Sequence, residues 1–352
     1  METCRNWFTY IYLTIFGICL CYSLFSGILG VGVSTKYPYL WYGGVLLVMG
    51  GLWLVANTLA MLVSHYNLYG LRLRNPIISK IIEAILVIAV IISAAAVRLW
   101  IIRSLPVQPE SDFRTYYKIA ELLAQGTLLR DGGGYCDYIS QFPHVIGYPY
   151  ILSKIFAVFG PSVKAGLYFN LSVSILSIIS VNRIGRLISG RAGGFFAMLL
   201  VAFWPSQILY INQMASEPLF MCLTLLCIWI IAYLFKKPDS NKDSRTLVLC
   251  VLLGILFAIA GAVRPMAIIL LIALSICIIT FKAKASEISR AGLIKSLMSR
   301  GWIRISVILA SYVVCSLIIN GAIARTIDRE LPGSTVSFGY NLMVGLNLES
   351  KG

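Results

Sequence analysis

Apolar runs long enough to cross a bilayer recur along the chain and alternate with short polar segments. Each run holds about 17 to 24 residues with little charge, which suits a helix that spans a hydrocarbon core of roughly 30 Å. The pattern predicts an all-α polytopic membrane protein with about nine spans. The predicted spans are 8–29, 40–63, 81–104, 166–182, 192–211, 218–235, 246–263, 266–282 and 304–322.

The interval 106–163 is a long segment rich in polar, aromatic and turn-forming residues between two of these runs. Within it, Ser111 to Leu123 has the apolar stripe of an amphipathic helix, with Ser111 as its expected N-cap. The sequence DGGG at 131–134 predicts a break in regular structure. A further apolar run, 146–159, would form a helix of only ~21 Å, which is too short to span a bilayer.

The basic residues decide whether 146–159 crosses the membrane. Lys and Arg gather in the cytoplasmic loops of membrane proteins. Four connections are rich in them, namely 64–80, 182–191, 236–245 and 282–304. These four fall on one side only if 146–159 returns to the side from which it came. The prediction is a cytoplasmic N-terminus, with 106–163 as a large first outer loop that carries juxtamembrane helices.

Composition agrees with this assignment. Hydrophobic residues make up 59% of the chain and charged residues 12%, against about 25% charged in soluble domains, so a soluble core is excluded. The net charge of +15 follows from the positive-inside bias, and nucleic acid is therefore not a predicted partner. The nine cysteines form no CxxC or Cys/His cluster that would indicate zinc. The predicted location is the cell membrane, as a multi-pass protein.

Four ionisable residues are expected near the outer membrane surface, where such groups are functional candidates. They are Asp112 after the third span, His144 in a Phe-Pro-His turn, Glu217 at the start of the sixth span and Arg264 before the eighth. Each also has a structural explanation. Asp112 and Glu217 suit the N-termini of helices. Arg264 suits snorkelling to the interface, and His144 suits a polar loop.

Aromatic and basic residues near the same surface have ordinary explanations too. Tyr116, Tyr117, Tyr148 and Tyr150 fit an interfacial aromatic belt. Arg98, near the outer end of the third span, is expected to snorkel. The sequence has no GxGxxG, Walker, DxD or HExxH motif in a suitable context, which disfavours a cytosolic nucleotide-sugar enzyme. Chemistry on the outer face would draw on lipid-linked donors.

The order of motifs resembles a known family. An outer Ser-Asp pair is followed by aromatics and an A-x-x-L-x-x-G helix end. A Pro-rich turn then leads into a short helix that ends in Phe-Gly. After this helix come an Arg-rich inner turn and an outer acid. The residues are Ser111, Asp112, Tyr116, Tyr117, Ala120, Leu123, Gly126, Phe159 and Gly160. This order is similar to bacterial multispan glycosyltransferases of the GT-C fold, in particular the family 39-like group related to protein O-mannosyltransferases and aminoarabinose transferases. The resemblance covers roughly 100–280 and the GLNLESKG end.

The resemblance implies a GT-C-like helical bundle that moves a hexosyl- or pentosyl-type sugar from a polyprenyl-phosphate donor to an acceptor hydroxyl, with inversion. Asp112 matches the outer-loop general base, and Glu217 matches the second outer acid. Arg264 would bind the donor phosphate.

His144, Tyr148 and Tyr116 would line the sugar site. The acceptor would be a glycan, lipid or protein. A divalent metal stays open, because no ligand set is evident.

Three regions are expected: an extra N-terminal transmembrane hairpin at 1–80, a GT-C-like module at 81–322, and an outer-facing segment at 323–352. A chain end directly after YNLMVGLNLESKG favours a shortened chain, although nine spans also suffice for a complete one.

Two other classes stay open beside the enzyme. A transporter or flippase for lipid-linked glycans would place charged groups or broken helices near the bilayer midplane, whereas the predicted spans hold few charges inside. A non-catalytic assembly protein would use the outer loop only to bind a partner. The sequence does not identify the sugar, the acceptor, the lipid chain length or the oligomeric state.

Overall fold

The computed structural model describes residues 76–236, 244–273 and 302–331, and the regular structure in these ranges is helical. This confirms the all-α polytopic class. The chain divides into two units, Met1–Ser79 and Lys80–Gly352, and the description below concerns the second. The predicted spans 8–29 and 40–63, and with them the N-terminal hairpin, lie outside the described residues, as do most of 266–282 and the segment 332–352.

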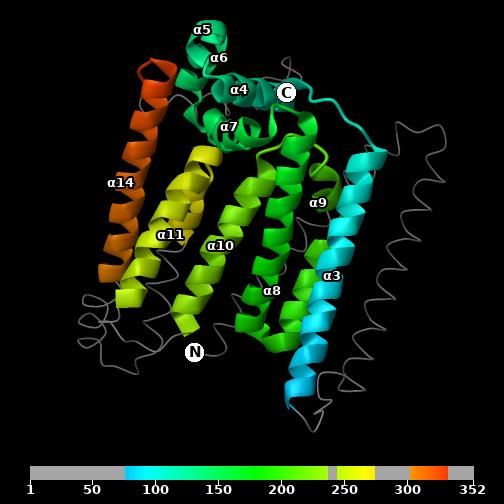
Figure 1. Ribbon diagram of the computed structural model, residues 1–352. Helices are drawn as coiled ribbons and strands as arrows, with labels where there is room; N and C mark the ends of the chain where they lie inside the picture. Colours follow the sequence, from blue (N-terminus) through cyan, green and yellow to red (C-terminus); the bar gives the residue numbers. More distant parts are fainter. Residues whose placement is uncertain (1–75, 237–243, 274–301, 332–352) are drawn as a thin grey trace, which may run out of the picture. The chain divides into compact units, whose positions relative to one another are not determined.

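Five helices in the described ranges are long and apolar enough to cross a membrane. They are α3 (Pro76–Ser104), α8 (Val163–Ala202), α10 (Glu217–Lys236), α11 (Ser244–Val263) and α14 (Trp302–Ile327) (Figure 1). Many of their large apolar side chains are exposed, as on α3 and α14, which is expected where lipid replaces water as the solvent. The total of nine spans stays a prediction.

The 40-residue helix α8 is a hairpin of two arms joined at Gly190. Gly190 has φ 76° and ψ −168°, a conformation that glycine adopts without strain. A Cβ added to Gly185 would lie 2.7 Å from the Cα of Gly194, although nine residues of straight helix would separate the two by about 13 Å. The arms therefore fold back on each other, and they correspond to the predicted runs 166–182 and 192–211. The second run is interrupted after Ala202, and α9 (Pro205–Tyr210) completes it.

Arg98 does not snorkel as the sequence suggested. Its side chain is fully buried and binds both arms of the α8 hairpin, through Nε to Ser174 Oγ at 3.0 Å and through Nη1 to the Ala202 carbonyl at 2.7 Å. Ala202 is the last residue of α8, where backbone carbonyls lack partners inside the helix and favour a cation. The guanidinium therefore finds acceptors for Nε and Nη1 within the protein and does not reach the interface, while its buried Nη2 has no hydrogen-bond partner.

An acid of α3 holds the turn of this hairpin. Glu83 binds Arg186 Nη1 at 2.7 Å and Arg191 Nε at 3.5 Å. Two of the arginines that the positive-inside rule assigned to the cytoplasmic turn thus also close the hairpin onto α3.

The segment between α3 and α8 forms a cap of short helices at one end of the spanning helices. It contains α4 (Ser111–Gln125), α5 (Leu128–Asp131), α6 (Gly133–Gln141), the 3-10 helix η1 (Pro143–Ile146) and α7 (Gly147–Phe159). Helix α7 packs against α4 and contacts α8 and α11, and it lies across the helix ends (Figure 1). It is not among the helices that could cross a membrane, as the charge pattern required.

The start of α4 differs from expectation. Glu110 is the N-cap, in extended conformation and without a side-chain cap hydrogen bond. Ser111 is the first residue of the helix and has φ 50°, in the left-handed region that costs a residue with a Cβ about 1–2 kcal/mol. Two carboxylates flank this strained residue, Glu110 before it and Asp112 after it.

Close contacts fix the cap to the helices below. A Cβ at Gly147 would overlap the backbone carbonyl of Ala262, so the first turn of α7 rests directly on the end of α11. At the other side, Arg329 Nε lies 3.0 Å from Asp137 Oδ1 and joins the end of α14 to α6. The cap is therefore placed by the ends of α11 and α14.

Candidate functional site

A cavity of about 340 Å³ lies between the cap and the end of α11. Helices α4, α6, η1 and α11 contribute to its wall, and the residues that line it are Asp112, Thr115, Tyr116, Tyr138, His144, Val145, Val263, Arg264, Pro265 and Met266. Four residues that the sequence singled out are among them: Asp112, Tyr116, His144 and Arg264. They come from three places in the chain, and the fold brings them to one cavity.

Glu217 reaches the same cavity through an ion pair. Its Oε1 lies 2.6 Å from Arg264 Nη1. Glu217 is the first residue of α10, and Arg264 follows the last residue of α11, with its backbone N–H bonded to the Ala260 carbonyl. Each charge therefore also complements the dipole of its own helix, as the structural explanation of Glu217 anticipated; the one given for Arg264 was snorkelling to the interface. The second carboxylate oxygen, Glu217 Oε2, is buried and has no hydrogen-bond partner.

Tyr116 connects α4 to the start of α10. Its hydroxyl shares a hydrogen bond with the Ser216 side chain, and Ser216 is buried beside Glu217. Burial raises the pKa of Tyr116 above its ordinary value, and the nearby Glu217 and Asp112 carboxylates act in the same direction. The phenol therefore stays protonated and can donate a hydrogen bond inside the cavity.

His144 is held as a neutral imidazole. Burial lowers its pKa below the ordinary value of 6.5, and the positive charge of Arg264 lowers it further. Its ring packs edge-on against Phe142, with 6.4 Å between the ring centroids. A neutral imidazole has one donor and one acceptor nitrogen, which suits contacts with sugar hydroxyls.

Tyr148 does not line this cavity. It is fully buried and stands behind Tyr116, with 5.7 Å between the two ring centroids. Its hydroxyl donates to Asn170 Oδ1 at 3.0 Å, and Asn170 Nδ2 donates to the Gln213 carbonyl at 2.7 Å. This chain of bonds runs from α7 through α8 to the segment that leads to Glu217, so Tyr148 supports the wall from behind.

Two polar residues of this arrangement were not among the candidates predicted from the sequence. Asn170 is fully buried inside an apolar run of α8, and Ser216 precedes Glu217. A buried Asn within a predicted span is itself a signal, because an amide at membrane depth needs partners. Ser216 carries no comparable signal.

Asp112 lies in the first turn of α4, with an exposed side chain at the rim of the cavity. The carboxylate is therefore open to a ligand that enters from outside. Among the described residues, no group of three His, Cys, Asp or Glu side chains could hold a metal ion.

An apolar groove of about 370 Å³ borders the polar cavity. Helices α7, α11 and α14 form it, and its residues include Ile151, Ile259, Ile318 and Ile323. Val263, the last residue of α11, lines both spaces. The polar cavity lined by Arg264 and the apolar groove thus lie on either side of Val263.

Residues 143–310 match the family of dolichyl-phosphate-mannose-protein mannosyltransferases. No curated protein and no solved structure matches the chain. The family match confirms the resemblance to GT-C-type enzymes, and it supports a glycosyltransferase that uses a lipid-linked sugar donor. The matched segment contains His144, Tyr148, Glu217 and Arg264, whereas Asp112 and Tyr116 precede it. Membership of the family 39-like group stays a prediction.

Proposed function

We propose that the chain transfers a sugar from a polyprenyl-phosphate donor to an acceptor hydroxyl in the cavity between α4 and the end of α11. One observation carries the proposal: Asp112, His144 and Arg264 line a single cavity, and Glu217 holds Arg264 at its edge. A carboxylate, a neutral imidazole and a guanidinium supply a base, hydroxyl contacts and a phosphate ligand.

Asp112 is the general base of this proposal. The acceptor oxygen attacks the anomeric carbon while its proton passes to the Asp112 carboxylate. The bond between the anomeric carbon and the phosphate oxygen breaks, and polyprenyl phosphate leaves with the electron pair. A single displacement of this kind inverts the anomeric carbon.

Arg264 stabilises the charge that develops on the leaving phosphate. Its guanidinium has five N–H donors in a planar fork, and the ion pair with Glu217 involves one nitrogen, Nη1. Glu217 orients the fork toward the cavity, and a pre-oriented cation needs little reorganisation during the reaction. Glu217 therefore acts through Arg264, as a positioning residue.

The apolar groove takes the first isoprene units of the donor. The groove meets the polar cavity at Val263, next to Arg264. A phosphate bound by Arg264 would thus have its lipid in the groove of α7, α11 and α14 and its sugar toward Asp112. His144 and Tyr116 contact the sugar hydroxyls, and Tyr148 keeps Tyr116 in place.

Mannose is the first donor sugar to test, because the matching family is named for dolichyl-phosphate-mannose. The charge pattern of the loops supports a reaction on the outer face of the cell membrane, with a cytoplasmic N-terminus, as part of this proposal.

The proposal is tested in proteoliposomes that contain the full chain and labelled polyprenyl-phosphate mannose, with mannobiose added as the acceptor. The expected result is release of free polyprenyl phosphate, with a donor KM raised at least about tenfold in Arg264→Ala. The matched control is Arg130→Ala, because Arg130 is an exposed arginine of the cap that pairs with Asp131. Movement of intact donor across the bilayer without release of polyprenyl phosphate would indicate a transporter and overturn the proposal.

A further inference from the structure

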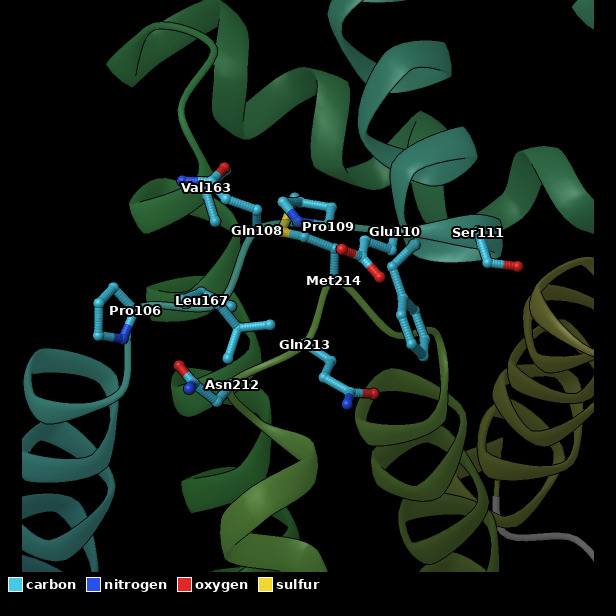
Figure 2. Close-up of a pocket in the computed structure, with 12 residues that line it drawn as sticks. Pro106, Gln108, Pro109, Glu110, Ser111, Val163, Leu167, Asn212, Gln213 and Met214 are labelled. Carbon is cyan, nitrogen blue, oxygen red and sulfur yellow. The ribbon is translucent and has the colours of Figure 1, made fainter.

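A second cavity of about 470 Å³ lies beside the first turn of α4 (Figure 2). The extended segment before α4 runs along one side of it, and Asn212 and Gln213 lie opposite. Val163 and Leu167 of α8 complete the wall. Its volume falls within the range of about 300–1,000 Å³ that is usual for small-molecule sites.

The two cavities have no lining residue in common, but neighbouring residues of the same segments line them. Glu110, Ser111 and Phe113 line the second cavity, while Asp112 and Tyr116 line the first. The segment 212–217 divides in the same way: Asn212, Gln213 and Met214 line the second cavity, whereas Glu217 pairs with Arg264 at the first. The strained turn at Ser111 thus stands between two ligand-sized spaces, with one carboxylate facing each.

The second cavity differs from the first in that no basic side chain lines it. Its lining residues include the Glu110 carboxylate and the amides of Gln108, Asn212 and Gln213, and none of them is Lys, Arg or His. A phosphate would be repelled here by Glu110, whereas the first cavity offers Arg264. Carboxylates and amides hydrogen-bond well to neutral hydroxyls, and Phe113 adds an apolar face.

One buried atom in this wall needs a donor. Asn212 is only 5% exposed, and its Nδ2 donates to the Leu105 carbonyl, but its Oδ1 is buried without a hydrogen-bond partner. A buried acceptor left unpaired costs about 1–3 kcal/mol. Because this oxygen has almost no exposed surface, the Asn212 side chain has to turn toward the cavity for a ligand hydroxyl to supply the missing donor.

We propose that this second cavity is the acceptor site, that it takes an uncharged, hydroxyl-rich carbohydrate, and that the acceptor hydroxyl reaches Asp112 across the first turn of α4. The inference rests on the proposed function, since it names the substrate class for the second half of the same reaction. It also explains why the first turn of α4 places Glu110 and Asp112 at different cavities.

The test measures binding of mannobiose to the full chain in nanodiscs by saturation-transfer NMR. Two variants report on the cavity. Val163→Trp fills it from α8, and Glu110→Ala removes its carboxylate without loss of a cap, because Glu110 makes no side-chain cap bond. We expect each to weaken mannobiose binding at least about tenfold. Leu200→Trp is the matched control, because Leu200 is exposed on the second arm of α8, and it should bind as the wild type does.

Polyprenyl-phosphate mannose binding is measured on the same samples. Val163→Trp and Glu110→Ala should retain the donor affinity of the wild type, which also shows that they fold. Mannobiose binding that is absent from the wild type, or unchanged in both variants, overturns the acceptor site. The acceptor site for carbohydrate is also overturned if the wild type binds a Ser/Thr peptide with blocked ends (acetylated and amidated) more tightly than mannobiose, and if Val163→Trp abolishes that peptide binding. If the wild type fails to bind the lipid donor, the proposed function is contradicted. This result is distinct from failure of the acceptor site, which is measured with mannobiose.

Discussion

Glu217 and Arg264 join the first residue of α10 to the residue after α11, with 2.6 Å between Oε1 and Nη1. Such a pair between two helix ends has a structural explanation, because each charge complements a helix dipole. The buried, unpaired Oε2 of Glu217 is not explained in that way. A pair that served stability alone would be expected to satisfy both carboxylate oxygens.

The two explanations of this pair predict different results for Glu217→Met/Arg264→Met. The double variant removes both charges and leaves no unpaired ion, and a half-buried pair contributes about 1 kcal/mol or less. We expect a melting temperature within a few degrees of the wild type, but transfer reduced about 10²-fold or more, because the leaving phosphate loses its cation. Thermal unfolding in detergent and donor turnover are measured on one preparation. Retained turnover would assign the pair to stability alone.

His144 should make the protein less stable as the medium becomes acidic. Its pKa in the folded chain lies below the ordinary 6.5, so the unfolded chain binds a proton first as the pH falls. The unfolded state then holds more protons than the folded state, and the free energy of unfolding decreases below pH 6.5 until the folded pKa is reached. His144→Gln should flatten the acid side of a melting-temperature profile. His65, the other histidine of the chain, provides the control through His65→Gln. An identical acid slope in His144→Gln and the wild type would refute the assignment.

Gly147 should tolerate no side chain. A Cβ there would overlap the carbonyl of Ala262, and backbone cannot rotate away as a flexible side chain can. Gly147→Ala should lift α7 from the end of α11 and destabilise the protein by about 1–3 kcal/mol, with reduced transfer because Arg264 follows the same helix end. Gly134→Ala is the control, since a Cβ at Gly134 meets nothing within 4 Å. Equal melting temperatures for the two variants would show that the contact is not tight.

Arg98 should matter for stability, whatever the chemistry of the protein. Arg98→Leu leaves the Ala202 carbonyl and Ser174 hydroxyl without their donor, and we expect a loss of about 3 kcal/mol. Arg103→Leu removes an exposed arginine from the same helix and should change stability little. Lipid-linked sugar transfer per folded molecule should stay at the wild-type level in Arg98→Leu, because Arg98 lies away from the cavity walls. A selective loss of turnover would instead point to a role in transport or catalysis.

The sequence predicted the placement of the chemistry better than its details. Loop charge alone put Asp112, His144, Glu217 and Arg264 at one end of the helices, because each crossing reverses the side of the chain. Together with the short length of the run 146–159, the loop charge also predicted that this helix does not cross the membrane. These predictions depend on the length of one apolar run and on the number of membrane crossings between basic loops, and both can be counted along the sequence.

What the sequence did not reveal depends on partners from distant segments. Arg98 is buried because the α8 hairpin ends beside it with free carbonyls, and nothing near Arg98 in the sequence indicates this. Tyr148 is a support and not a wall residue because Asn170 on the next helix receives its hydroxyl. Ser111 has a left-handed φ although Ser is a good N-cap, because the chain must turn sharply from its extended approach into α4.

The general base is the central claim, and turnover of Asp112→Asn tests it most directly. The amide keeps the size of the carboxylate but cannot accept the acceptor proton. We predict transfer from polyprenyl-phosphate mannose reduced about 10³-fold, with donor affinity and melting temperature unchanged. Asp131→Asn, another exposed carboxylate of the cap, should transfer as the wild type does. Full transfer by a folded Asp112→Asn protein would contradict the account.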